Sequence, residues 1–442
     1  MLKFYEIIKS MRIYNNMATA GTSIKTSEKL TGIKFVFRAL RHRNYQLFFS
    51  GQCLSLIGTW MTIIATSWLV YRLTDSVFLL GIVNFSGRIP SLFLAPFAGA
   101  LADRWNRQKL LVVTQICSML QSFALAALAL TGTINIWHII FLNVFQGIIN
   151  AFDMPTRQAF VTDMVENKED LLNAIALNSS MFNGARLVGP SIAGVLIAAF
   201  GEGMCFLIDG ISYGAVIIAL MAMKIKPKET VQKKNLFLEM KEGFRYVVDF
   251  IPVRAIILLL ALVSLVGMPY TILMPVVAKK ILNGGPNTLG FLMASTGTGA
   301  LLGALYLASR KSVLGLGRVI VICTCIFGAG LIAFSFSHYL WLSMILMVFT
   351  GFGMMVQLAS GNTILQTVIE DSKRARVMSF HGMAFMGMVP IGSLLAGTVA
   401  DRVGVQNTFI LCGLFVIAGA LLFAANLPTL REKTRPLYIK MN

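Results

Sequence analysis

Residues 110–136 read LLVVTQICSMLQSFALAALALTGTINI and contain no charged side chain. A helix needs about 20 mostly apolar residues to cross the hydrocarbon core of a bilayer, so this run is long enough to span a membrane. A second uncharged run covers residues 256–278. Only 13% of the chain is charged, whereas soluble proteins carry about 25%. The sequence therefore predicts an all-α integral membrane protein.

Twelve apolar runs are candidate spans, six on each side of a longer polar segment. They cover residues 45–71, 77–101, 109–130, 135–154, 174–200, 203–223, 255–278, 288–309, 319–336, 339–362, 377–400 and 405–427. We expect a cytoplasmic N-terminal tail (1–44), an N-terminal six-helix bundle (45–223), a cytoplasmic linker (224–254), a C-terminal six-helix bundle (255–427) and a cytoplasmic C-terminal tail (428–442). Helical spacing of apolar residues within 236–250 of the linker predicts an amphipathic helix on the membrane surface.

The distribution of Lys and Arg predicts the orientation. If the N-terminus is inside, 32 of the 38 basic residues lie in cytoplasmic segments, and the outside loops hold only Arg72, Lys279, Lys280 and Arg402. Cytoplasmic loops of membrane proteins carry such an excess. We therefore expect a multi-pass protein of the cell (inner) membrane with both termini in the cytoplasm. Because the net charge of +19 comes from these short loops, nucleic acid is not an expected partner.

Several classes of site have no support in the sequence. The chain has no GxxxxGK[ST] phosphate loop, and its four histidines and six cysteines lack metal-ligand spacing. No catalytic groups cluster at the ends of the spans. We expect no metal, no cofactor and no enzymatic activity.

Polar side chains recur on one face of two spans. In the first span, steps of three and four residues join Gln52, Ser55, Thr59, Thr62 and Thr66; in the fourth, they join Asn143, Gln146, Asn150, Asp153 and Arg157. Hydrogen bonding between helices would explain either stripe, but two stripes containing amides favour a water-accessible cavity. The candidate substrate-cavity residues are Gln52, Ser55, Thr59, Asn143, Gln146, Asn150 and Gln357.

Three ionisable residues lie deeper in the spans. Counted from the outer surface at ~1.5 Å per residue, Asp209, Arg88 and Arg186 lie roughly 9, 17 and 21 Å down. An extended Arg88 side chain could reach Asp209, and Arg186 could do so through a water. Desolvation favours the protonated form of an isolated carboxyl. Asp209 is therefore a candidate proton carrier with Arg88 and Arg186 as partners, and a static structural pair is the alternative.

The loop after the second span reads GALADRWNRQK (residues 99–109). It resembles the first inner-loop motif of the major facilitator superfamily, Gly-x-Leu-x-Asp-Arg-x-x-Arg-x-Lys/Arg. The resemblance implies two pseudo-symmetric six-helix bundles that work by alternating access. It also implies a cytoplasmic gate at the inner loop and the inner end of the fourth span, formed by Gly99, Asp103, Arg104, Arg107, Asp153 and Arg157.

Further motifs narrow the resemblance. GARLVGPSIAG (184–194) resembles the fifth-span motif of drug:proton antiporters through Gly184, Gly189, Pro190 and Gly194, and GMVPIGSLLAG (387–397) indicates an internal repeat. LNVFQG (142–147) resembles their fourth-span motif, but Asn143 stands where they usually have arginine. FDMPTRQAFVTDMV (152–165), SGRIP (86–90) and FLIDGISY (206–213) resemble the branch that includes the enterobactin exporter and macrolide-efflux proteins.

The resemblance implies a monomeric, proton-coupled exporter of a small amphipathic molecule such as a siderophore or drug. Its partners would be the small-molecule substrate, protons and the lipid bilayer. The alternatives are a lysophospholipid or lipid flippase of the same fold, an importer, which the fifth-span motif disfavours, and a non-transporting membrane sensor.

Overall fold

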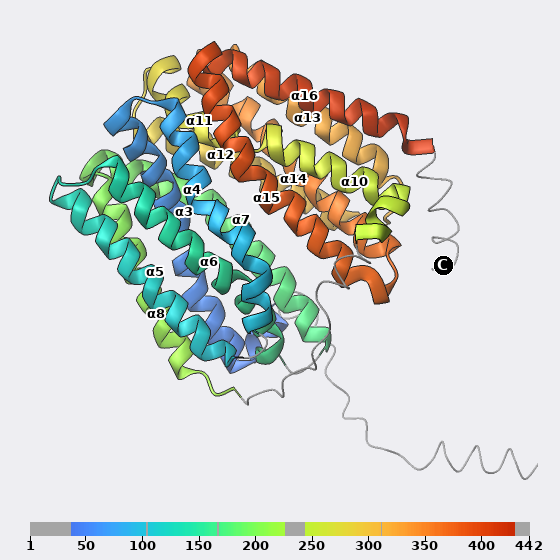
Figure 1. The fold of residues 1–442 in the computed structure, drawn as a ribbon, viewed down its shortest axis with the longest axis horizontal. Helices are drawn as coiled ribbons and strands as arrows, with labels where there is room; N and C mark the ends of the chain where they lie inside the picture. Colours follow the sequence, from blue (N-terminus) through green and yellow to red (C-terminus); the bar gives the residue numbers. More distant parts are fainter. Residues whose placement is uncertain (1–36, 103–104, 166–167, 226–243, 311, 429–442) are drawn as a thin grey trace, which may run out of the picture. The chain divides into compact units, whose positions relative to one another are not determined.

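The computed structural model describes residues 37–102, 105–165, 168–225, 244–310 and 312–428 (Figure 1). Within these residues, 12 helices are long and apolar enough to cross a membrane, as the sequence predicted. Those of the first half are α3 (Arg43–Thr74), α4 (Val77–Ala102), α5 (Arg107–Leu130), α6 (Ile136–Met164), α7 (Lys168–Phe200) and α8 (Glu202–Ala222).

The seventh span is broken into four segments. They are α10 (Ile251–Leu262), the π-helix η2 (Val263–Gly267), α11 (Tyr270–Val276) and the π-helix η3 (Val277–Ile281). Pro269 and Pro275 lie in this span, where a proline removes a backbone donor and disturbs the helical hydrogen bonds. Five further helices complete the second half: α12 (Pro286–Ser309), α13 (Leu316–Ser335), α14 (Leu340–Val368), α15 (Asp371–Val403) and α16 (Val405–Ala425).

Several helices are longer than the apolar runs that predicted them. The fourth span was expected to end at residue 154, but α6 continues to Met164. Backbone hydrogen bonding does not stop where hydrocarbon ends, so polar residues can extend a helix beyond the bilayer. Of the amphipathic helix expected at 236–250, residues 244–249 are helical, and residues 236–243 lie outside the described residues.

The two halves repeat one packing pattern. In the first half, α3 packs on α7 and α8, α5 on α6 and α8, and α4 on α6. In the second half, the broken seventh span packs on α15 and α16, α13 on α14 and α16, and α12 on α14. These are equivalent pairs when the spans of each half are numbered one to six. The halves meet along two further pairs, α4 with α15 and α7 with α12.

Glycines make the contacts between the halves. A Cβ added to Gly397 would lie 3.1 Å from the Cα of Gly81, and one added to Gly290 would lie 3.0 Å from the Cα of Gly194. These two pairs join α4 to α15 and α7 to α12. Small residues allow such close approach in a bilayer, where apolar side chains gain little by leaving lipid.

The fifth and eleventh spans also contact their own halves in equivalent ways. A Cβ on Gly189 of α7 would lie 3.0 Å from the backbone oxygen of Ile57 in the first span. A Cβ on Gly392 of α15 would overlap the backbone oxygen of Leu265 in the seventh span. The repeated motifs at 184–194 and 387–397 thus perform the same packing task twice, which accounts for their similarity.

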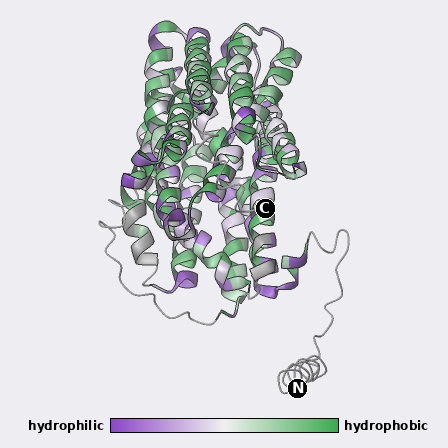
Figure 2. Cartoon of the chain, turned by 90° about the vertical axis from the view of Figure 1, so that its right-hand side faces the viewer, coloured by the Kyte–Doolittle hydropathy of each residue, from purple (hydrophilic) through white to green (hydrophobic). Residues whose placement is uncertain are grey.

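The surface of the spans is apolar. Large side chains such as Phe141 and Ile218 are each 71% exposed, and Trp137 is 73% exposed. Figure 2 shows hydrophobic residues along the length of the helices, with fewer hydrophilic residues among them. This distribution suits helices whose outer faces contact lipid.

The contact between α12 and α14 predicts a large effect of Gly299→Ala on stability. A Cβ on Gly299 would overlap the backbone oxygen of Val348 and lie 2.8 Å from the backbone nitrogen of Phe352. Because backbone atoms cannot move aside cheaply, we expect a loss of about 1–3 kcal/mol in the free energy of unfolding, measured by denaturant titration of the purified protein in detergent.

Gly214→Ala is the matched control. No heavy atom lies within 4 Å of a Cβ added at Gly214 of α8. Alanine favours a helix interior over glycine by up to about 1 kcal/mol, so this change should leave stability equal or higher. Equal losses in both variants would contradict the packing described for Gly299.

Candidate transport site and gates

The loops define two ends of the molecule. The Arg107 end carries the starts of α3, α5 and α7, and the Asp75 end carries the turn between α3 and α4. Glycine contacts between the halves run from Gly194 and Gly81 toward the middle of the spans, where Gly297 meets Leu187 and Gly387 meets Leu92. In the conformation described, the halves are therefore joined from the Asp75 end to about mid-span.

Five side chains from both halves gather at mid-span. We name Trp60, Phe182, Arg186, Tyr270 and Met354 the central cluster. The Arg186 guanidinium lies 5.7 Å from the centroid of the Trp60 ring, and its Nη2 lies 3.9 Å from the sulfur of Met354. Trp60 meets Phe182 edge-on, with ring centroids 5.7 Å apart. The cluster joins α3 and α7 of the first half to α11 and α14 of the second.

Tyr270 reaches the cluster through the break in the seventh span. It is the first residue of α11, directly after Pro269, and its side chain is fully buried. Its hydroxyl lies close enough to Arg186 and Thr296 for electrostatic interaction but has no hydrogen-bond partner. Sequence reasoning missed this residue, although a proline beside a tyrosine in an apolar span was a usable signal. Departures from α-helical geometry often mark functional sites.

Asp209 lies inside the first half. Its side chain is almost fully buried on α8, and its Oδ2 accepts hydrogen bonds from the hydroxyls of Thr62 and Ser122, both at 2.9 Å. Its Oδ1 has no partner. A Cβ added at Gly58 of α3 would lie 2.6 Å from this Oδ1. The carboxyl is thus held by neutral hydroxyls and packs tightly against α3.

The structure does not join Asp209 to the two arginines expected as its partners. Arg186 contacts the central cluster instead. Arg88 forms no hydrogen bond or ion pair with the described residues, and its side chain is exposed. Depth along a helix put these three residues within reach of one another but did not reveal which way each side chain faces. The expected ion pairs are absent from the described conformation.

The predicted gate residues form two ion pairs at the Arg107 end. Asp153 pairs with Arg157 and accepts hydrogen bonds from Thr114 at 3.0 Å and Gln115 at 2.8 Å. Arg107 pairs with Asp163 at 2.9 Å, an acid that sequence reasoning did not single out. Gly99 belongs to α4, and Asp103 and Arg104 lie outside the described residues.

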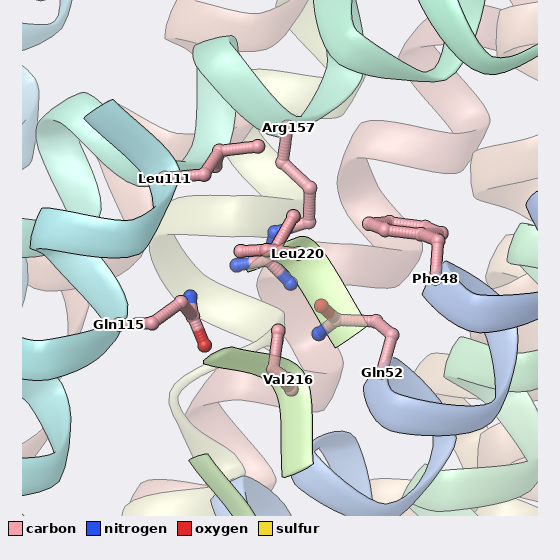
Figure 3. Close-up of a pocket in the computed structure, with 7 residues that line it drawn as sticks. All are labelled: Phe48, Gln52, Leu111, Gln115, Arg157, Val216 and Leu220. Atoms are coloured by element: carbon pink, nitrogen blue, oxygen red, sulfur yellow. The ribbon is translucent and has the colours of Figure 1, made fainter. Parts of the chain in front are cut away.

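A small pocket adjoins the Asp153 pair. The Arg157 side chain points between Gln52 and Gln115 (Figure 3). The complete lining is Phe48, Gln52, Leu111, Gln115, Arg157, Val216 and Leu220. All seven residues belong to the first half, so the pocket is not the space between the halves.

The α3 stripe faces into the first half. Gln52 and Ser55 are buried, Thr59 donates a hydrogen bond to the backbone of Ser55, and Thr62 bonds Asp209 of α8. The assignment of Gln52, Ser55 and Thr59 to a water-accessible substrate cavity stays a prediction, because in the described conformation these residues pack within the first half. Helical spacing shows that residues share a face, but it does not show which neighbour that face contacts.

The remaining predicted cavity residues have different environments. Asn143 lies beside Gly87, and its Nδ2 has no partner. Gln146 donates hydrogen bonds to Ser118 at 3.2 Å and to Asn150 at 3.3 Å. Asn150 is exposed, whereas Gln357 on α14 is buried with its Oε1 unpartnered.

An ion-pair cluster joins the halves at the Asp75 end. Asp75 lies 2.9 Å from Lys280 and 3.5 Å from Lys279, and both ammonium groups lie over the Tyr71 ring. We name these four residues the Asp75 latch. The hydrogen bond from Lys280 lowers the pKa of Asp75 below its ordinary value. At the same end, Arg72 pairs with Glu202 at 2.7 Å within the first half.

Asp75→Asn should loosen the Asp75 end. It removes the charge that attracts Lys279 and Lys280, so amide hydrogen exchange should become faster in residues 72–80 and 277–290, measured by mass spectrometry. Because the pKa of Asp75 is lowered in this closed form, the latch is fully formed above the ordinary carboxyl pKa of about 4 and is lost as pH falls through the lowered value. The wild type should then show the same loosening only below about pH 4.

Arg72→Gln is the control for this prediction. It breaks an ion pair at the same end, but Arg72 and Glu202 both belong to the first half. Exchange in 277–290 should stay as in the wild type. If Arg72→Gln loosens that segment as much as Asp75→Asn does, the latch does not hold the halves together.

A family model and several known proteins match most of this chain. A family model described as transmembrane secretion effector matches residues 36–438. The chain is 28% identical over 377 residues to a staphyloferrin A transporter of Staphylococcus aureus, covering 85% of this chain and 94% of that one. It is 26% identical to a macrolide efflux protein A of Streptococcus pyogenes, covering 86% and 96%.

A solved structure shows the same fold. A bacterial homolog to the human lysosomal transporter Spinster, in an inward-facing and unoccupied conformation, superposes with a TM-score of 0.68 at 14% identity. The match covers 89% of this chain and 97% of that one. At this identity the likeness concerns the fold alone.

Proposed function

This chain belongs to the transmembrane secretion effector family of the major facilitator superfamily, and from that premise we propose that it exports small amphipathic molecules from the cytoplasm in exchange for protons. Proteins of this family are membrane transporters, not enzymes. The observation that carries the proposal is the central cluster, where side chains of both halves surround a partly accessible arginine at mid-span. A substrate bound there would contact both halves, as alternating access requires.

The relatives support the direction of transport. One is named a macrolide efflux protein and another a multidrug efflux pump. The positive-inside rule supports a cytoplasmic Arg107 end. In that orientation the described conformation is closed toward the outside by the Asp75 latch. Opening to the outside would break the latch and bring the halves together at the Arg107 end.

Fusion reporters test this orientation. Green fluorescent protein fused after Asn442 should fluoresce, because it folds in the cytoplasm. Alkaline phosphatase fused after Gly132, in the loop between α5 and α6, should be active, because it needs the oxidising exterior. The reverse pattern would place the Arg107 end outside and overturn the proposed orientation.

Helix α3 offers a physical route for proton coupling. Its Thr62 bonds Asp209 on one side, and its Trp60 contacts Arg186 on the other. A change in the protonation of Asp209 would alter the hydrogen bonds from Thr62 and Ser122 and so shift α3 relative to α8. Such a shift would move Trp60 in the central cluster. Asp209 would thus act through α3 rather than through an arginine partner.

Asp209→Asn should abolish proton-driven transport while leaving the protein folded. The amide keeps the size of the side chain, but it cannot bind and release a proton as a carboxyl group does. Transport is measured as loss of a lipophilic fluorescent dye and a catecholate siderophore from efflux-deficient bacteria, with and without a protonophore. Gly58→Ala should also impair transport, because the new Cβ would crowd Asp209. Asp401→Asn, at an exposed acid of the Asp75 end, should transport normally.

The outcomes of this assay distinguish proton-driven export of a small molecule from transport of a lipid. Protonophore-sensitive loss of either solute, absent in Asp209→Asn, supports proton-driven export and identifies the solute class. Wild-type transport by Asp209→Asn would overturn the coupling role. Retention of both solutes, with the protein verified in the membrane, would argue against small-molecule export and make a lipid flippase assay the next step.

A further inference from the structure

Arg186 has no anionic partner among the residues that the structure describes. Its guanidinium contacts the Trp60 ring and the Met354 sulfur, and it forms no ion pair with the described residues. A guanidinium presents five N–H donors, and a thioether sulfur is only a weak acceptor. A charge at mid-span is costly in a membrane protein unless it faces water or a partner. Arg186 therefore retains most of its capacity to bind an anion.

Two buried acids of the first-half spans already have partners of their own. Asp209 accepts hydrogen bonds from Thr62 and Ser122 within the first half. Asp153 pairs with Arg157 near the Arg107 end. The simplest source of an anion for Arg186 is therefore a bound ligand, because neither Asp209 nor Asp153 then has to leave its present partners.

The surroundings of Arg186 suit an amphipathic anion. Arg186 is half-buried, and Phe182, one helical turn away on α7, is 44% exposed. Trp60 lies between them and contacts both. Tyr270 and Met354 of the same cluster are fully buried. The Tyr270 hydroxyl has no hydrogen-bond partner, so it is a second unpaired polar group beside Arg186. An accessible cation therefore adjoins an accessible aromatic surface.

We propose that Arg186 binds a carboxylate of the exported substrate while Trp60 and Phe182 contact its aromatic or alkyl part. The substrates are then small amphipathic organic anions. This inference rests on the proposed export function and assigns Arg186 a role in substrate recognition, in place of the proton-coupling role expected from the sequence. A planar guanidinium matches a carboxylate through two parallel hydrogen bonds.

Binding to a matched pair of probes tests the proposal. The full-length protein in lipid nanodiscs is titrated calorimetrically with 1-naphthylacetate and with its neutral isostere 1-naphthylacetamide. We expect the carboxylate to bind at least about tenfold more tightly, because a hydrogen bond to a charged group contributes more than a neutral one. In Arg186→Gln this preference should fall to about twofold or less, and Arg186→Lys should keep part of it.

Two arginine variants control for the loss of a positive charge. Arg402→Gln changes an exposed residue of the Asp75 end and should keep the full preference for the carboxylate. Arg88→Gln changes the other mid-span arginine and should also keep it. If Arg88→Gln removes the preference and Arg186→Gln does not, the assignment to Arg186 is overturned.

A second measurement does not depend on the folding of any variant. Phenylglyoxal modifies accessible arginines, and mass spectrometry reports the modification at each site of the wild-type protein. 1-Naphthylacetate should protect Arg186 and leave Arg402 reactive, whereas 1-naphthylacetamide should protect neither. Equal modification of Arg186 with and without the carboxylate would overturn the proposal.

The binding measurements and the export assay test different proposals, and either proposal can fail without the other. Dye export without any carboxylate preference keeps the proposed function and overturns this inference. An Arg186-dependent preference in a protein that exports nothing keeps the binding site and overturns export. Lysophosphatidate that binds more tightly than 1-naphthylacetate, through Arg186, would replace the small organic anion with a lipid.

Discussion

Between α4 and α15, and between α7 and α12, the two halves of this transporter meet through glycines. At Gly81 with Gly397, and at Gly194 with Gly290, backbones approach closely enough that a Cβ would contact the opposite chain. Lipid tails are as apolar as the helices, so hydrophobic burial does not favour this association over contact with lipid. Dispersion between closely packed backbones and a few polar contacts such as the Asp75 latch hold the halves together. An interface of this kind can separate at one end without unfolding either half.

Buried polar contacts also stabilise the interior of the first half. Asp153 and Asp209 are buried and bonded to side chains of neighbouring helices. Removing one partner from such a site would leave a buried polar group unsatisfied, which costs more than the bond itself contributes. The first half is therefore expected to move as a rigid body. Helix α3 is the exception, because it takes part in both the Asp209 site and the central cluster.

The sequence was sufficient for the fold because a bilayer imposes simple constraints on length, polarity and hydrogen bonding. Apolar runs located the twelve spans, and the loop motif at 99–109 indicated the superfamily. The sites were harder to predict. The polar stripe from Gln52 to Thr62 shares one helix face, as expected, but that face contacts α8. Depth placed Asp209 near Arg88, yet nothing in one sequence gave the rotation of each helix about its axis.

Two further features could not be predicted from the sequence for a similar reason. Arg107 pairs with Asp163 of the next helix, a contact between residues far apart in the chain. Tyr270 joins the central cluster because the seventh span departs from α-helical geometry just before it. A periodic pattern assumes one regular helix and therefore places residues beyond such a break on the wrong face.

The proposed roles of Arg186 and Asp209 together have an electrical consequence. A carboxylate leaving the cytoplasm and a proton entering it each move the equivalent of one positive charge inward. Each such charge gains about 2.3 kcal/mol per 100 mV of membrane potential, so one exchange would gain about 4.6 kcal/mol at an interior-negative 100 mV. Exchange of a neutral substrate for one proton would gain only half as much free energy from the membrane potential. An unpaired arginine at mid-span thus does more than select an anion, because it lets the membrane potential act on the substrate as well as on the proton.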